Sequence, residues 1–110
     1  MAKRTLTAEV VRSVAFGDIT DTYSNLGSAL SNALIMIIFK NTTEVTLFIS
    51  EDGTNNHYEL PSGNTEIYDF QTNSRSDDIL AKSVGMQFEV KYDGAIAPTQ
   101  GKVIMQGQYI

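Results

Sequence analysis

The single histidine, His57, is the residue in this sequence that is best suited to acid–base chemistry. A Ser-His-Asp arrangement would have to use it, with Asp52 or Asp93 orienting the ring and a serine as the nucleophile. No other sequence feature supports that arrangement, because His57 directly follows an Asp-Gly-Thr-Asn-Asn turn at the start of a predicted strand. We therefore expect His57 to face solvent. One histidine also cannot form a multi-histidine zinc site.

Two adjacent carboxylates, Asp77 and Asp78, are a second candidate for catalysis. Neighbours in sequence point in different directions, so they do not converge on one bond as a glycosidase pair does. We expect them in a solvated loop or at the cap of a short helix.

A cluster of oxygen-bearing residues at one turn offers ligands for calcium. The cluster consists of Glu51, Asp52, Asn55 and Asn56. It lacks the regular acidic spacing of an EF-hand loop, and turn formation alone explains these residue types. The glycines match neither a P-loop nor a dinucleotide-binding motif. The sequence therefore predicts no enzyme, no cofactor and no metal site.

Length and composition limit both the domain count and the kinds of partner. With 110 residues, the chain has room for one β domain, in which residues 1–5 are an extended N-terminal arm. Lys and Arg number 8 against 13 Asp and Glu, and the net charge of −5 disfavours nucleic-acid binding because phosphates are repelled. The absence of cysteine excludes disulfides and thiolate zinc sites.

No segment has the length or pattern of a membrane or export signal. The longest apolar run, residues 33–39, is far short of the roughly 20 residues that a membrane-spanning helix needs. The N-terminus starts with positive residues, but no apolar region follows them. We expect a protein that is made and kept in the cytoplasm of its producer.

The first predicted strand has apolar residues on one side and polar residues on the other. The apolar positions are Leu6, Ala8, Val10, Val14 and Phe16. Arg12 interrupts that apolar side. Residues 17–31 are rich in turn formers and predict a long loop, which a short helical turn would end.

The continuous apolar run at 33–39 predicts a strand that is covered on both faces at the centre of the core. A turn at 41–43 leads to a strand at 45–50, and we expect these two strands to pair as a hairpin. A strong turn signal at 51–56 then leads to a strand at 58–60, which Pro61 ends.

The second half of the chain continues this pattern of short strands and turns. Residues 67–70 predict a strand, 72–78 a loop, and 79–82 either a helical turn or a strand. Alternation predicts strands at 86–92 and 103–110, the last of them pinned in a sheet. About seven or eight short antiparallel strands without βαβ spacing predict an all-β fold. We expect a small β-sandwich, jelly-roll-like or immunoglobulin-like, with a small β-barrel as the alternative.

The aromatic residues outnumber what so small a core can hold, so we expect some of them to contact other subunits. The candidate subunit contacts are Tyr23, Phe48, Tyr68, Tyr92, Tyr109 and Ile110. An alternative interpretation is that they cover the rim of the sheets. Edge strands offer a second kind of contact, in which a neighbour's strand extends the sheet.

Short segments along the chain, read in order, resemble a group of small virion structural proteins of tailed bacteriophages. The segments are RSVAFGDI (12–19), GSAL (27–30), NTT (41–43), ISEDG (49–53), LPSG (60–63), DFQTN (69–73) and YDG (92–94). They are turns and strand starts, and they span most of the chain. Glu51 departs from the bulky apolar residue that is expected before Asp-Gly in that group.

The resemblance implies a non-enzymatic virion structural protein that assembles in many copies in the head-to-tail neck or tail. The alternative location is the capsid, as a decoration or cement protein. Implied partners are copies of the chain itself and the portal, adaptor, tail or capsid proteins, with no specific nucleic acid and no membrane. The implied location is the virion, after synthesis in the cytoplasm of the host bacterium.

Net negative charge favours the neck or tail, since it lets DNA slide through a channel without sticking. The loop at 17–31 and the N-terminal arm are the segments that we expect to reach an adjacent subunit. A carbohydrate-binding β-sandwich is the alternative from another class, with Tyr58, Tyr68 or Tyr92 stacking on sugars. The absence of tryptophan disfavours that alternative.

Overall fold

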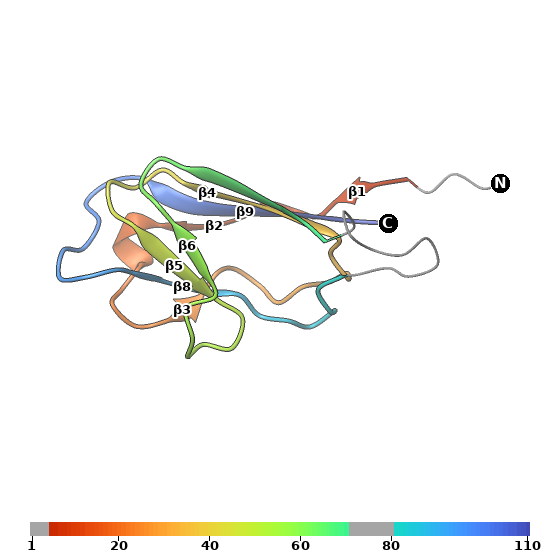
Figure 1. Cartoon of the computed structure of the whole chain (residues 1–110), viewed down its shortest axis with the longest axis horizontal. Helices are drawn as coiled ribbons and strands as arrows, with labels where there is room; N and C mark the ends of the chain where they lie inside the picture. Colours follow the sequence, from red (N-terminus) through yellow and green to blue (C-terminus); the bar gives the residue numbers. More distant parts are fainter. Residues whose placement is uncertain (1–4, 71–80) are drawn as a thin grey trace.

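The computed structural model describes residues 5–70 and 81–110, which fold into two antiparallel β-sheets packed face to face (Figure 1). These residues form strands and one 3₁₀ turn but no α-helix, so the predicted all-β sandwich is confirmed. They form nine strands, where the sequence predicted about seven or eight. The elements are β1 (Thr7–Ala8), β2 (Arg12–Ala15), η1 (Phe16–Asp18), β3 (Ser24–Asn25), β4 (Met36–Asn41), β5 (Leu47–Ser50), β6 (Tyr58–Leu60), β7 (Thr65–Asp69), β8 (Glu89–Tyr92) and β9 (Lys102–Tyr109).

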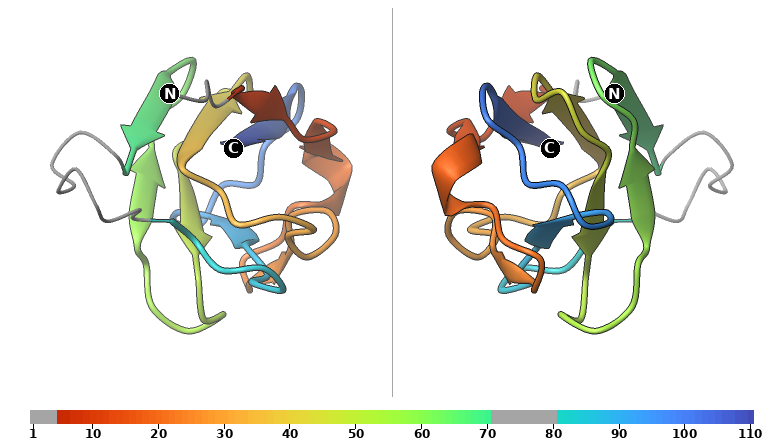
Figure 2. Two further views of the ribbon diagram at one scale, coloured as in Figure 1. Left: turned by 90° about the vertical axis from the view of Figure 1, so that its right-hand side faces the viewer. Right: turned by 90° about the vertical axis from the view of Figure 1, so that its left-hand side faces the viewer.

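The two sheets are called sheet A and sheet B. Sheet A has the order β1-β9-β4-β7, and β2 pairs with the same edge of β9 as β1. Sheet B has the order β3-β8-β5-β6. Figure 2 shows sheet A above sheet B, with β6 and β7 (green) on one side of the sandwich and β2 and β3 (red to orange) on the other.

Most connections cross from one sheet to the other. Among the described strands, β5 and β6 are the only consecutive ones that pair, with Leu47 opposite Leu60, and they confirm the hairpin around the 51–56 turn. The predicted hairpin between residues 33–39 and 45–50 is wrong, because β4 lies in sheet A and β5 in sheet B. The chain passes over the end of the sandwich at this point.

Asn41 directs this crossing. Its side chain is fully buried, and its Oδ1 accepts hydrogen bonds from the N–H of Thr43 at 2.9 Å and from the Thr43 hydroxyl at 2.7 Å. Its Nδ2 donates to the carbonyl oxygens of Val45 and Leu60, each at 2.9 Å. The turn predicted at 41–43 therefore forms, but its hydrogen bonds lead to the opposite sheet instead of back along β4.

β4 lies between β9 and β7, at the centre of sheet A. Ile37 and Phe39 are fully buried between the sheets, whereas Met36 and Ile38 are half-buried on the outer face. The prediction that this strand is covered on both faces is therefore wrong for a single copy of the chain. The outer face of sheet A keeps apolar side chains that are partly open to solvent.

Aromatic rings fill the middle of the core. The ring centroid of Phe39 lies 5.8 Å from that of Phe88 and 5.5 Å from that of Tyr58. Tyr68 approaches the same ring edge-on, at 5.9 Å. Edge-to-face contacts of this kind stabilise aromatic clusters beyond the burial of their area. The core is thus continuous from sheet A to sheet B.

The long loop predicted at 17–31 is confirmed, and β3 interrupts it. The helical turn forms at its start, as η1, and not at its end. Ile19, Leu26 and Leu30 from this segment are buried in the core. The loop is therefore fixed to the domain at several points.

β9 confirms the predicted final strand and lies in the interior of sheet A. Its eight residues pair with β4 along one side and with β1 and β2 along the other. Gly107 is required in it, because a Cβ at that position would lie 2.3 Å from Cδ1 of Leu34. The strand predicted at 86–92 is shorter than expected and begins at Glu89.

Part of the sequence prediction lies outside the described residues. This applies to the loop at 72–78 and to Ile79 and Leu80. At the end of that segment, Lys82 exchanges backbone hydrogen bonds with Leu34 at 2.8 and 2.9 Å. The strand predicted at 67–70 forms as β7, one residue earlier than Phe70 at its end.

An extra residue interrupts the N-terminal edge of sheet A. Ala8 lies opposite Gln108 and Arg12 lies opposite Met105, so the edge advances four residues while β9 advances three. Such a β-bulge shifts the alternation of side chains by one position. The prediction of one regular strand here is therefore wrong, and Val10 is 86% exposed instead of facing the core.

Candidate functional site

The loop between β5 and β6 holds the acidic residues and the histidine that the sequence offered for chemistry. Asp52 Oδ1 accepts hydrogen bonds from the N–H groups of Asn55 and Thr54, both at 2.8 Å, and from the Ser50 hydroxyl at 2.9 Å. Asp52 Oδ2 accepts one from Asn55 Nδ2 at 2.7 Å. These bonds, led by the backbone N–H of Asn55, hold the pKa of Asp52 well below its usual range. Both carboxylate oxygens of Asp52 thus accept hydrogen bonds from within the turn.

His57 is exposed, as predicted, and does not form a catalytic relay with its neighbours. Its Nδ1 accepts a hydrogen bond from the N–H of Glu51 at 2.9 Å, and its Nε2 lies 4.0 Å from Asp52 Oδ2. In a Ser-His-Asp arrangement, the histidine stands between the serine and the carboxylate. Here Asp52 stands between Ser50 and His57, which leaves no proton path from the hydroxyl to the imidazole.

The oxygen-bearing residues of this loop do not point to a common centre. Asp52 bonds within the turn, and Glu51 bonds outside it. In residues 5–70 and 81–110, no group of three or more histidine, aspartate or glutamate side chains is arranged to hold a metal ion. Asp77 and Asp78 lie outside the described residues.

The Asp52 turn should respond to acid and to removal of its charge. Because folding lowers the pKa of Asp52, its carboxylate stabilises the turn above the unfolded-state pKa of about 3.9. That stabilisation is lost as the pH falls through the lower folded-state pKa. We expect Asp52→Asn to speed amide exchange at Thr54 and Asn55, measured by NMR, whereas the control Asp93→Asn leaves both unchanged. A carboxyl titration of Asp52 at the ordinary pKa would contradict this account.

Glu51 connects the β5–β6 hairpin to the segment at residue 82. Its Oε2 lies 2.8 Å from Lys82 Nζ and accepts a hydrogen bond from the Tyr58 hydroxyl. Burial favours a higher pKa for Glu51, but the hydrogen bonds from Lys82 and Tyr58 outweigh it and lower that pKa. Burial and the Glu51 contact raise the pKa of Tyr58. Glu51 thus has internal partners at the position where the phage proteins are expected to carry a bulky apolar residue.

Three of the predicted contact residues contribute to the core of their own domain. Tyr68, Tyr92 and Tyr109 are half-buried and pack against the core cluster. Their rings are therefore only partly available to a neighbour. Their role as subunit contacts stays a prediction.

The other predicted contact residues lie on the surface, and the structure does not gather them in one place. Phe48 is half-buried on the outer face of sheet B, and Ile110 is exposed at the end of β9. Tyr23 is held near the 51–57 loop, where its hydroxyl donates to Asn56 and the Nζ of Lys91 lies 5.0 Å from its ring centroid. The six residues therefore form several separate contact candidates.

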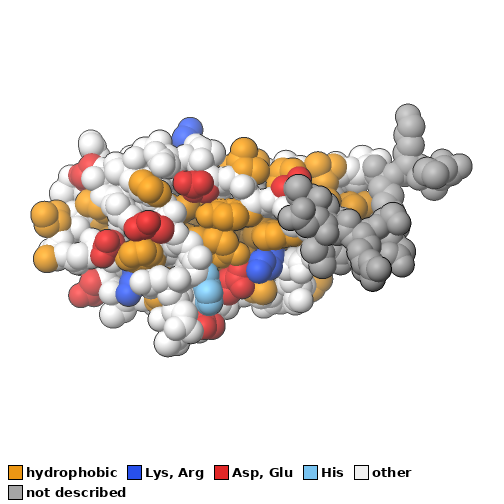
Figure 3. Space-filling model, viewed as in Figure 1, with side chains coloured by type: hydrophobic (Ala, Val, Ile, Leu, Met, Phe, Trp, Pro, Cys, Tyr) orange, Lys and Arg blue, Asp and Glu red, His pale blue; other side chains and the backbone are white. Residues whose placement is uncertain are grey.

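The tyrosines proposed for sugar stacking are packed against each other. The rings of Tyr58 and Tyr68 meet edge to face, with centroids 4.7 Å apart and planes at 61°. Tyr58 belongs to β6 and Tyr68 to β7. Figure 3 shows hydrophobic side chains gathered on the side of the sandwich where these two strands lie. Tyr92 belongs to β8, on the other side of β5 from Tyr58. A flat platform for a sugar ring is not formed by this trio.

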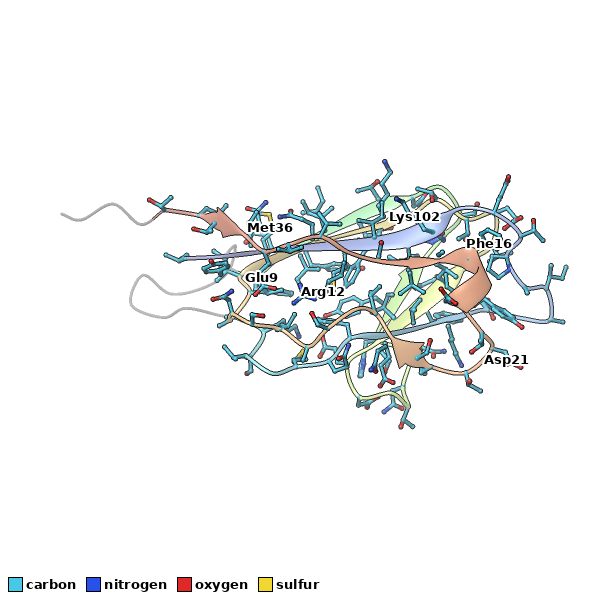
Figure 4. All side chains as sticks on the ribbon, turned by 180° about the vertical axis from the view of Figure 1, so that it is seen from behind. Glu9, Arg12, Phe16, Asp21, Met36 and Lys102 are labelled. Atoms are coloured by element: carbon cyan, nitrogen blue, oxygen red, sulfur yellow. The ribbon has the colours of Figure 1, made fainter. Side chains whose placement is uncertain are left out.

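The sequence did not reveal the ion pair beneath the bulge. Arg12 Nη1 lies 2.8 Å from Glu9 Oε1, and the two side chains are only 8% and 4% exposed. Arg12 also donates to the carbonyl oxygens of Ser28 at 2.8 Å and Ala29 at 3.1 Å, and Asn32 Nδ2 donates to Glu9 Oε2 at 2.8 Å. Figure 4 shows Glu9 and Arg12 directed from the edge strand into the space between the sheets.

This network fixes the charge of Glu9 as well as the bulge. Burial favours a higher pKa for Glu9, but the hydrogen bonds from Asn32 and Arg12 outweigh it and lower that pKa. A simple period-2 pattern placed Glu9 and Arg12 on opposite faces, because it allowed for no bulge. The available signal was Val10-Val11 flanked by opposite charges.

The bulge also creates an apolar surface and a pocket. Val10 and Val11 are both exposed. Leu6, which precedes β1, and Ile110, which follows β9, are exposed too, and β1 pairs with that end of β9 through Thr7 and Tyr109. Beside them is a pocket of about 550 Å³. Its lining comes from residues 8–12, from Gly27, Ser28, Ser31 and Asn32, and from Tyr109.

In the described parts of the chain, no helix is long and apolar enough to cross a membrane. Comparisons with protein-family models, with curated proteins and with solved structures find no match to this chain. The resemblance to phage virion proteins therefore depends on the sequence segments quoted above.

Proposed function

We propose that this chain is a non-enzymatic structural subunit of a tailed-bacteriophage virion, which assembles in many copies in the head-to-tail neck or tail. The observation that carries the proposal is the N-terminal edge of sheet A. Leu6, Val10, Val11 and Phe16 are all exposed on this one segment. Apolar side chains gathered at a sheet edge are typical of a surface that a neighbour buries.

Two further observations support assembly as the task of this domain. The bulge holds Val10 and Val11 outward on a rigid base, because the Glu9–Arg12 pair is bonded to the 28–32 segment. The net charge of −5 suits a ring around a channel through which DNA passes. The sequence resemblance then specifies the kind of assembly.

Native mass spectrometry of the purified protein tests the proposed location. A neck or tail subunit should form closed rings of about six or twelve copies. Trimers, or a monomer that binds only to assembled capsids, would instead support a capsid decoration protein. The wild-type protein should be compared at several concentrations, because ring formation depends on mass action.

The virion role itself has a separate test. Antibody labelling of purified particles, or a low-resolution map of the virion, should locate the protein at the neck or tail. Its absence from purified particles would contradict the proposed function whatever its oligomeric state in solution.

A further inference from the structure

The outer face of sheet A combines apolar side chains with two lysines. Lys40 pairs with Ile104 across the strands, and Lys102 precedes Ile104 by two residues on the same face. Both lysines are exposed. Half-buried Ile38 lies beside Ile67, which is 61% exposed. This surface, together with Met36 and Asp69 at its other end, is called face A.

The outer face of sheet B has an aromatic centre and two carboxylates. Phe48 pairs with Glu59 on one side and with Lys91 on the other. Glu89 is half-buried on the same face of β8, opposite Ser50, and its Oε2 lies against Gly53 of the loop after β5. This surface is called face B.

The charges of the two faces are complementary. Face A carries two lysines against one aspartate, and face B carries two glutamates against one lysine. Lys91 is held over the ring of Tyr23, which leaves the carboxylates to dominate face B. Among the described residues, none of the ion pairs includes Lys40, Lys102, Glu59 or Glu89.

We propose that copies of this chain stack with face A of one copy against face B of the next. This inference deepens the proposed function and rests on it, because it names a further pair of surfaces, besides the N-terminal edge of sheet A, through which many copies assemble. Phe48 of one copy packs on Ile38 and Ile104 of the next. Lys40 and Lys102 face Glu59 and Glu89.

The continuous apolar run of β4 agrees with this stacking. The apolar run at 33–39 has the composition of a strand covered on both faces. Its part within β4 begins at Met36, and there one copy of the domain covers only the inner face. A second sheet laid on face A completes the burial, as in the packing of two sheets about 10 Å apart. Because the two faces differ, the contact is heterologous and repeats from copy to copy into a ring or a filament.

Charge reversal tests the stacking. The first variant carries Lys40→Glu and Lys102→Glu, and the second carries Glu59→Lys and Glu89→Lys. In each variant both faces have the same sign, so self-association should weaken by at least about tenfold in sedimentation velocity, since like charges across an interface repel. An equimolar mixture should associate again, because each face A of one variant meets an oppositely charged face B of the other.

A matched control separates this effect from a change in net charge. Glu44→Lys with Asp93→Lys changes the charge as much as the second variant does, but at exposed positions in the loops after β4 and β8, outside both faces. This control should associate like the wild type, and circular dichroism should show that all variants are folded. Phe48→Ser is a further variant that should weaken association without changing charge.

The outcomes distinguish this inference from the proposed function. Recovery on mixing supports the stacking. Unchanged association of the single variants, or no recovery in the mixture, overturns it. The stacking is also overturned if the wild-type protein is monomeric alone and assembles only with another virion protein. In that case, finding the protein in purified virions would still support the proposed structural role.

Discussion

Replacing Arg12 with Met should lower the free energy of unfolding by about 3–5 kcal/mol, because it leaves a buried carboxylate without its counter-charge. Glu9 would keep only the hydrogen bond from Asn32. The carbonyl oxygens of Ser28 and Ala29 would also lose the guanidinium that they share. Urea unfolding followed by circular dichroism gives this difference directly, from the midpoint and the slope.

A double variant provides the control. Glu9→Leu combined with Arg12→Met removes both charges, so it should be less destabilised than Arg12→Met alone. The pH dependence should differ as well. In the wild type the lowered pKa of Glu9 means that stability is present above the unfolded-state value and is lost as the pH falls. In Arg12→Met the unpaired carboxyl of Glu9 is easier to protonate. The difference in unfolding free energy between this variant and the wild type should therefore become smaller in acid. A single-variant cost below about 1 kcal/mol would contradict the structural role of the pair.

Gly101→Ala should be the second large effect, at about 2–5 kcal/mol of destabilisation, from a positive φ and a backbone collision together. Gly101 has φ of 84°, and a Cβ there would lie 2.3 Å from the carbonyl oxygen of Thr42. That oxygen cannot move freely, because Thr42 bonds through its N–H and its hydroxyl to the carbonyl of Lys102, each at 2.9 Å. Thermal unfolding measures the loss.

Gly94→Ala is the matched comparison for Gly101→Ala. Gly94 has φ of 89°, and no atom lies within 4 Å of the position that a Cβ would occupy. Replacing Gly94 with Ala should therefore lower the free energy of unfolding only by the cost of a positive φ, about 1–2 kcal/mol. Equal losses for the two variants would show that the contact with Thr42 does not matter.

The sequence predicts the fold class well because alternation and turn signals are local. The β5–β6 hairpin and β9 follow from patterns within a few residues. The pairing of β4 does not follow in this way, because Asn41 takes part in bonds that reach Leu60, far along the chain. A turn between two apolar strands looks the same whether it closes a hairpin or leads to a second sheet.

The candidate site was harder to predict for the same reason. A period-2 reading of residues 6–16 assumes an unbroken register, and one inserted residue at the bulge inverts it for Val10. The partner of Glu51 is Lys82, which is distant in sequence and carries no motif. The outward direction of the half-buried Phe48, in contrast, follows directly from its place between the buried Leu47 and Ile49, and the sequence predicted it as a contact residue.

The position of β9 sets the order in which this domain can be made. It is the last of the described strands, yet it lies between the N-terminal edge and β4, so β1 and β2 are joined to the rest of sheet A only through it. While residues 102–109 are still to be synthesised, β1 and β2 have no partner, and one edge of β4 is unpaired. Sheet A is therefore completed late, through contacts between distant segments that form slowly. A chain shortened before β9 would leave the edges of β2 and β4 exposed, and exposed strand edges invite aggregation.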